Sequence, residues 1–215
     1  LLSGKGLKAS YTIGKNTIGA MYARGPGFFR PYSYDGIALY HSFRTKKLMW
    51  NNYYSTQTYK TLYTKTDLVN TSISYKINSH HQFLLGGGAS IQNYKRDNVT
   101  AVSPGYGYDA TYSASFNKVN GSISYATGTG NYAIAHGTTM LSGRVNYNLN
   151  PKKLVAFSFQ NFTQAPQYFQ NGIIRNSPPT RSDRYELRYG IQSPTAFAFL
   201  KPTYLYESNL VLRTR

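Results

Sequence analysis

Apolar and polar residues alternate with a period of two along most of this chain of 215 residues. In one such stretch Leu7, Ala9, Tyr11 and Ile13 alternate with Lys8, Ser10 and Thr12. The same alternation recurs in residues 69–77, 110–116, 119–125, 141–149, 155–160 and 185–192. Successive side chains of a β-strand point to opposite faces, so this period predicts strands with one apolar face. No window shows the spacing of an amphipathic helix, and the sequence therefore predicts an all-β fold.

Short segments rich in Asn and Gly separate the predicted strands. They lie at residues 14–16, 78–80, 117–118, 128–131 and 148–151, and both residue types tolerate the positive φ of tight hairpin turns. Three longer connections contain prolines, and we expect loops there: residues 25–36, 96–105 and 165–184. The pattern predicts about twelve strands in one antiparallel up-and-down meander. No domain boundary is evident, so we expect residues 1–215 to form a single domain.

The composition narrows the class of protein further. Charged residues make up 14% of the chain, against about 25% in an average soluble domain. Cysteine is absent, which excludes disulfides, Cys-ligated metal centres and thiol catalysis within this sequence. Residues 119–143 and 154–174 lack Asp, Glu, Lys and Arg, but they are filled with polar residues. Neither segment therefore predicts a transmembrane helix.

The two faces of the predicted strands differ in an unusual way. The polar face carries mostly Ser, Thr, Asn and Gln, whereas the apolar face carries tyrosine beside the aliphatic residues, and the chain has 22 Tyr against 11 Phe. A buried tyrosine needs a hydrogen-bond partner, but a tyrosine at lipid-headgroup level does not need a protein partner. The candidates for such an aromatic girdle lie near strand ends: Tyr22, Tyr53, Tyr54, Tyr94, Tyr106, Tyr108 and Tyr168.

These features together resemble the outer-membrane β-barrels of Gram-negative bacteria. The resemblance lies in strands such as Ser72-Ile73-Ser74-Tyr75, in the Asn/Gly turns and in the tyrosine-rich strand ends. It implies a transmembrane β-barrel, or a large part of one, in the bacterial outer membrane, with membrane lipid headgroups, including lipopolysaccharide, as partners. Members of that class commonly end on an aromatic residue, whereas this chain ends Leu212-Arg213-Thr214-Arg215. We therefore expect a fragment of a larger barrel, which other chains complete or cap.

The excess of basic residues has two interpretations. The chain carries 24 Lys and Arg against 7 Asp and Glu, a formal charge of +17. Most basic residues lie at predicted turns and strand ends, where they can meet anionic lipid headgroups. Lys8, Lys76, Arg144 and Arg188 instead occupy polar positions within strands, where they would line a lumen that favours anionic solutes or polymers. Because the basic residues are scattered along the chain, we expect no nucleic-acid partner.

No constellation of residues predicts chemistry. His80 and His81 are adjacent beside a turn, so on a regular strand they point to opposite faces and cannot chelate one metal. His41-Ser42 resembles the His and Ser of barrel lipases, but no supporting residues accompany the pair. Gly86-Gly87-Gly88 lacks the Lys and the helix of a phosphate loop. We expect no enzyme, no metal and no cofactor.

Two functions follow as expectations. The first is a non-catalytic outer-membrane channel or transport conduit, or a component of a secretion or assembly complex. The alternative is a soluble, tyrosine-rich carbohydrate-binding sandwich, in which exposed aromatic rings stack on sugars. The location of the tyrosines discriminates between them: two rings at the strand ends favour a membrane, and one clustered patch favours a ligand face.

Overall fold

A computed structural model describes residues 5–26, 33–59, 64–96, 99–150, 152–170, 173–192 and 197–209. Its strands are β1 (Lys5–Ile13), β2 (Asn16–Pro26), β3 (Ser33–Arg44), β4 (Leu48–Tyr59), β5 (Thr64–Lys76), β6 (His81–Arg96), β7 (Val99–Phe116), β8 (Val119–Gly128), β9 (Thr138–Asn150), β10 (Lys153–Gln164), β11 (Gln167–Gln170), β12 (Ile173–Asn176), β13 (Thr180–Gln192), β14 (Phe197–Leu200) and β15 (Thr203–Asn209). The described residues contain no helix, which confirms the all-β prediction.

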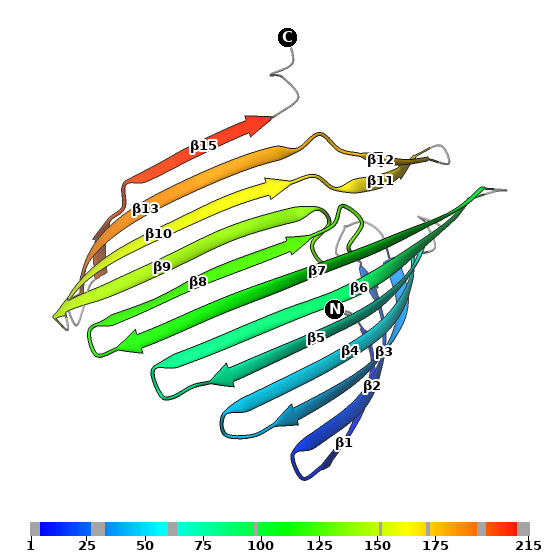
Figure 1. Cartoon of the computed structure of the whole chain (residues 1–215), viewed down its shortest axis with the longest axis horizontal. Helices are drawn as coiled ribbons and strands as arrows, with labels where there is room; N and C mark the ends of the chain where they lie inside the picture. The colour runs from blue at the N-terminus through cyan, green and yellow to red at the C-terminus, as the bar shows by residue number, and fades with distance from the viewer. Residues whose placement is uncertain are drawn as a thin grey trace.

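The strands form one antiparallel meander (Figure 1). Each of β1 to β10 pairs with its neighbours in chain order, and β13 pairs with β10. β14 and β15 pair with successive parts of the other edge of β13, so the sheet is twelve strands wide, as predicted. The short β11–β12 hairpin lies off this sheet. Among the described residues no pairing joins β1 to β14 or β15, so the sheet is open and not a closed barrel.

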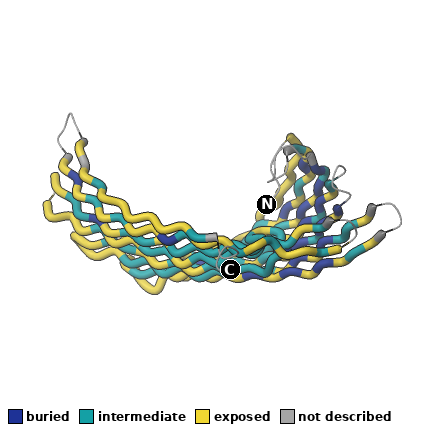
Figure 2. The backbone as a smooth tube through the Cα atoms, turned by 90° about the horizontal axis from the view of Figure 1, so that it is seen from above, coloured by how far each residue is buried: buried dark blue, intermediate teal, exposed yellow. Residues whose placement is uncertain are grey.

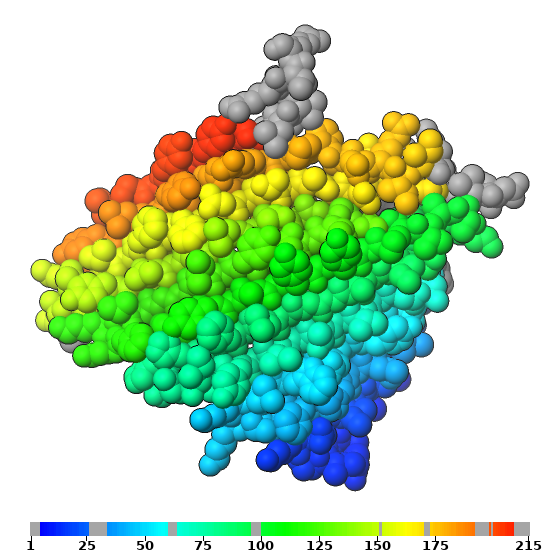
Figure 3. All heavy atoms as spheres, in the orientation of Figure 1, coloured from blue at the N-terminus to red at the C-terminus, as the bar shows by residue number. Residues whose placement is uncertain are grey.

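The space-filling view shows the strands side by side as one continuous surface (Figure 3). At one end of the sheet the strands are joined by tight turns, with positive φ at Gly14 (58°) and Asn117 (36°). Every described turn at this end carries a basic residue or histidine: Lys15, Lys46 and Lys47, His80, Lys118, and Lys152. The connections at the opposite end vary more in length, from residues 97–98 between β6 and β7 to residues 129–137 between β8 and β9. We call the two ends the turn end and the loop end.

The predicted loop at residues 96–105 is wrong, because Arg96 belongs to β6 and residues 99–105 belong to β7. β6 and β7 extend together to Arg96 and Val99, and Pro104 is paired with Ile91. A proline fits there because β8 pairs with β7 only from Gly107 onward. The prolyl nitrogen therefore lies on an edge that has no neighbouring strand to donate to. The predicted loops at 25–36 and 165–184 are shorter than expected, since β2, β3, β11, β12 and β13 extend into them.

Nearly all buried residues of the sheet lie on its polar face; Asp183 on the outer face is an exception, and every residue of β1 is exposed. Along β5 the polar-face residues Thr64, Thr66 and Ser74 are buried, whereas Val69 and Ile73 on the other face are exposed. The sheet is curved and not flat (Figure 2), so side chains on its concave face converge and cover one another. The more buried, polar face is therefore the concave one, and the apolar face points outward.

The segment 129–137, which joins β8 to β9, folds over the polar face at the loop end. Tyr132 is only 3% exposed, and Asn70 donates its amide hydrogen to the tyrosine hydroxyl oxygen at 3.3 Å. The ring lies on glycines of three adjacent strands that share one register row, Gly88, Gly107 and Gly128. A side chain at these positions would occupy the space of the ring. The expected tight turn at residues 128–131 is thus the start of a longer, inward-folded segment.

Hydrogen bonds hold this segment on both sides. The Asn131 side chain donates to Ser103 Oγ at 2.5 Å, and Gln92 Nε2 donates to the Asn131 carbonyl at 2.7 Å. On the other side the Gln167 amide donates to the Gly130 carbonyl at 2.8 Å. Burial lowers the pKa of His136 below its ordinary value, so its imidazole is neutral at pH 7.

A methyl group at Gly107 tests whether the ring contact is structural. An added Cβ would lie 2.5 Å from Tyr132 Cδ1 and 2.7 Å from the Thr127 carbonyl oxygen. We therefore expect Gly107→Ala to lower the free energy of unfolding by about 1–3 kcal/mol, measured by urea titration in detergent. The matched control is Gly87→Ala on the opposite face, where the nearest atom would be 3.3 Å away. Equal effects of the two variants would contradict the packing described here.

Candidate functional site

The central strands of the sheet bring several charged side chains together on the polar face. Arg144 of β9, Ser158 of β10 and Glu186 of β13 lie directly opposite one another in one register row. Residues two apart on a strand share a face, so Arg184 and Arg188 of β13 lie on the same side as Glu186. The result is a basic trough, which we define as the polar face around Arg144, Arg184, Glu186 and Arg188.

One carboxylate in the trough, that of Glu186, forms ion pairs with three cations. Glu186 Oε2 lies 3.0 Å from Arg184 Nη2 and 3.0 Å from Lys201 Nζ, and Glu186 Oε1 lies 3.2 Å from Arg188 Nη2. The glutamate side chain is 11% exposed, whereas the cations are 29–48% exposed. The cluster therefore keeps a surplus of two positive charges, which attracts anions along the trough.

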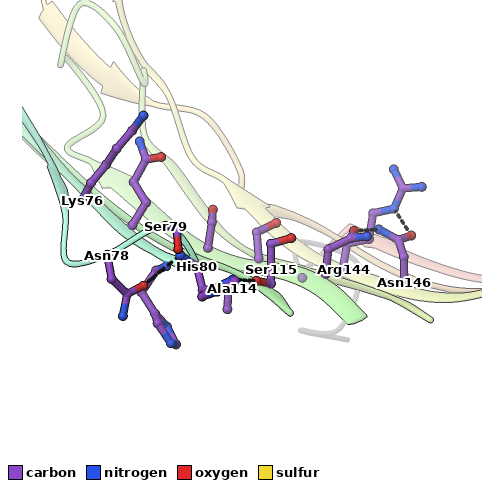
Figure 4. A pocket seen from close by; sticks show the side chains of 14 residues that line it. Lys76, Asn78, Ser79, His80, Ala114, Ser115, Arg144 and Asn146 are labelled. Atoms are coloured by element: carbon purple, nitrogen blue, oxygen red, sulfur yellow. Dashed lines mark hydrogen bonds between the residues drawn. The ribbon is translucent and has the colours of Figure 1, made fainter. Parts of the chain in front are cut away.

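Arg144 adds another positive charge beside this cluster. Its side chain is exposed, and its Nε donates to Asn146 Oδ1 at 2.8 Å, as Figure 4 shows. Asn146 in turn donates to Asn120 Oδ1 at 2.6 Å, which fixes the position of the amide. Within the described part of the chain, no carboxylate forms an ion pair with Arg144.

Three adjoining hollows follow the trough, and Arg144 lines all of them. The largest, of about 630 Å³, lies toward the turn end and is shown in Figure 4. The second, of about 280 Å³, includes Ser158, Gln160 and Arg184, and a third of about 60 Å³ lies between Arg144 and Arg188. Drug-sized ligands typically occupy sites of about 300–1,000 Å³, so the first two hollows together have room for a small solute.

Three of the four predicted lumen residues lie along this trough, and the fourth is remote. Lys76 lines the largest hollow, and Arg144 and Arg188 line the smallest. Lys8 lies on the same face but on β1, where its Nζ is 5.0 Å from the centroid of the Tyr40 ring. That these residues line a lumen remains a prediction.

Sequence reasoning missed the partners that organise the trough. Arg184 and Arg188 flank Glu186 at a spacing of two, a signal of same-strand ion pairs that the sequence does contain. Lys201 had no such signal, because it reaches Glu186 from the connection between β14 and β15.

The predicted girdle tyrosines divide between the two faces. Tyr22, Tyr54, Tyr106 and Tyr108 lie on the outer face and are 43–65% exposed. Register places Tyr53 and Tyr94 on the polar face instead, so their side chains are not part of that set. Tyr168 lies in β11, off the main sheet. An unpredicted row of aromatic residues crosses the outer face nearer the turn end: Tyr75, Phe83, Tyr112, Phe159, Tyr185 and Tyr204.

Tyr94 has a structural role on the polar face. Its ring stacks on Phe169 of β11 at 4.8 Å between centroids, and its hydroxyl donates to Gln92 Oε1 at 2.5 Å. Strands β7 to β10 separate β6 from β11 in chain order, so this contact requires the β11–β12 hairpin to bend inward. Together with Tyr132, it covers the loop end of the polar face.

His41 lies apart from the trough, whereas His80 and His81 lie beside its turn end. His41 and Ser42 are consecutive strand residues that point to opposite faces, and each bonds to an asparagine instead: His41 to Asn16 at 3.0 Å and Ser42 to Asn51 at 2.8 Å. His80 Nδ1 lies 2.6 Å from the Ser115 carbonyl oxygen, and His81 Nδ1 lies 2.6 Å from the Tyr112 hydroxyl. Gly86-Gly87-Gly88 lies within β6. The described residues contain no group of three or more His, Asp or Glu that could hold a metal ion.

No protein-family model matches the sequence, and no curated protein matches it. Among the described residues there is also no helix long and apolar enough to cross a membrane.

Proposed function

We propose that this chain forms the wall of a transmembrane β-barrel in a bacterial outer membrane and serves as a non-catalytic conduit for anionic solutes. The observation that carries the proposal is the inverted burial of the sheet: its apolar face is exposed, and its polar face is the more buried one. A sheet in water has the opposite arrangement, with the apolar face packed on a core.

The exposed apolar surface extends across the entire sheet. At least one large apolar side chain on each main strand is 40% exposed or more, and examples are Leu7, Ile18, Leu39, Trp50, Val69, Leu85, Tyr108, Ile123, Val145, Phe157, Leu187 and Leu200. Soluble monomers rarely expose a continuous apolar patch of more than about 300–600 Å². If hydrocarbon is the solvent of this face, the exposed apolar surface needs no further protein layer to cover it.

The height of the apolar band supports the proposed membrane location. On β6 it runs from Phe83 to Ile91, which is about 27 Å along the strand at about 3.4 Å per residue. A strand tilt of about 40° reduces this to about 21 Å, close to the roughly 25 Å of known outer-membrane barrels. Beyond the band, the lysines of the tight turns lie at one end, and the Arg24–Asp35 ion pair (3.2 Å) lies at the other.

The alternative of a carbohydrate-binding sandwich requires a second sheet over the apolar face. The exposed tyrosines also favour the membrane proposal, because they are spread from Tyr11 on β1 to Tyr204 on β15 and do not form one patch. A barrel in lipid must be closed, since every backbone group has to be hydrogen-bonded internally. We therefore propose that the free edges of β1 and of β14 and β15 pair with further strands.

An arginine on the outer face tests whether that face meets lipid. Ile123 lies in the middle of the band on β8 and is 47% exposed, so Ile123→Arg would cost less than about 0.5 kcal/mol if this face met water. In a bilayer we expect a loss of about 2–4 kcal/mol, measured by urea titration of the protein in lipid vesicles. The matched control is Ser113→Arg on the polar face, for which we expect a smaller loss. A neutral Ile123→Arg variant would overturn the membrane proposal.

Conductance tests the preference for anions. We expect the protein, purified from its membrane and inserted in planar bilayers across a KCl gradient, to give a reversal potential with the sign of chloride preference. Glu186→Gln removes the carboxylate that offsets three cations, so we expect this variant to increase the preference. Cation preference in the wild-type protein, or an unchanged ratio in the variant, would contradict the assignment of the trough.

A further inference from the structure

We propose that Arg144 is the centre of a binding site for a hydroxylated anion: a sugar or polyol that carries a phosphate or carboxylate group. The inference deepens the proposed conduit by naming its solute, and it rests on the conduit only for the ligand's path. Binding itself requires only the polar face as the structure describes it.

The Arg144 guanidinium differs from its two arginine neighbours in how it is engaged. Arg184 and Arg188 are already engaged with Glu186, at 3.0 and 3.2 Å. Arg144 is exposed, and its Nε bond to Asn146 orients the group while the Nη donors have no carboxylate partner within the described chain. An oriented guanidinium with free Nη donors matches the planar, two-point geometry of a phosphate or carboxylate.

A row of polar residues extends from Arg144 across the sheet. Register places Gln82 of β6, Ser113 of β7, Ser122 of β8 and Ser158 of β10 in one line with Arg144. Neighbouring strands lie about 4.8 Å apart, so the row offers hydroxyl and amide groups at regular intervals beside the cation. These groups both donate and accept hydrogen bonds, as the hydroxyls of a sugar or polyol do.

The lining also argues against other anions. Among the described residues, the lining of the largest hollow contains no Phe, Tyr or Trp, and that of the second contains only Phe159, which register places on the outer face. A nucleic-acid strand uses successive aromatic side chains as stacking platforms, and neither lining offers such a series. The volumes of about 630 and 280 Å³ instead suit a small solute that lies along the serine row with its anionic group at Arg144.

Calorimetric titration of the purified protein in zwitterionic detergent at low salt tests the site. The probes are glucose 6-phosphate, glucuronate, glucose and inorganic phosphate. We expect both sugar anions to bind more tightly than glucose, and glucose 6-phosphate more tightly than inorganic phosphate. Arg144→Gln should lower the affinity for both sugar anions about tenfold or more, because the two-point charged contact is lost. If only one sugar anion depends on Arg144, its anionic group identifies the ligand class.

The matched control is Lys8→Gln, which removes the same charge from the same face but at the remote strand β1. We expect it to change affinity less than twofold, and circular dichroism must show that both variants are folded. Equal losses in the two variants would show diffuse attraction and overturn the site. Inorganic phosphate binding as tightly as glucose 6-phosphate would overturn the hydroxyl half of the proposal, and no binding would overturn all of it.

The binding test of this site and the lipid test of the conduit can fail independently of each other. If Ile123→Arg destabilises the protein in lipid but no sugar anion binds, the membrane proposal stands and this inference fails. If the sugar anions bind through Arg144 but the outer face proves to be water-exposed, the site stands on a protein of another class.

Discussion

The ladder of backbone hydrogen bonds between neighbouring strands is the interaction on which this structure depends. A soluble domain is stabilised chiefly by an apolar core. Here the described residues include only six buried apolar side chains: Ala23, Tyr34, Ala38, Leu68, Tyr132 and Ala156. The continuous pairing from β1 through β10 to β13 instead satisfies the backbone strand by strand. Such complete backbone pairing suits a solvent without hydrogen-bond partners, in which each unpaired backbone group is costly.

The same ladder keeps the two faces of the sheet chemically distinct. Because side chains alternate along each strand, antiparallel pairing continues one apolar surface and one polar surface across twelve strand positions. On the polar surface, the pairing of β9, β10 and β13 brings Arg144 close to Arg184 and Arg188 in one trough, although Arg144 is distant from them in the sequence. At the loop end it is covered by Tyr132 and by the Tyr94–Phe169 stack, so the open hollows lie toward the middle and the turn end. In the proposed conduit, the basic trough would thus lie beside this covered end.

Much of this fold was predictable from the sequence, because period-two alternation depends only on local geometry. The all-β class, the number of strands and most turns follow from it. The segment around Pro104 was predicted wrongly as a loop. A strand tolerates a proline at this position because β8 does not extend this far, and that is a long-range property. Tyr53 and Tyr94 were assigned by nearness to strand ends, although their face depends on the parity of each strand. The inward position of Tyr132 and the Lys201–Glu186 contact (3.0 Å) depend on tertiary packing and had no local signal.

The single tryptophan offers the most direct test of the claim that the apolar face meets lipid. Trp50 lies on the outer face of β4 near the turn end and is 42% exposed. In vesicles containing lipids brominated at successive acyl depths, we predict quenching of its fluorescence, strongest for the shallow bromines, and protection from aqueous iodide. A variant that combines Trp50→Phe with Ser122→Trp moves the probe to the polar face and should show the reverse. Quenching of Trp50 by iodide but not by bromolipids would contradict the account.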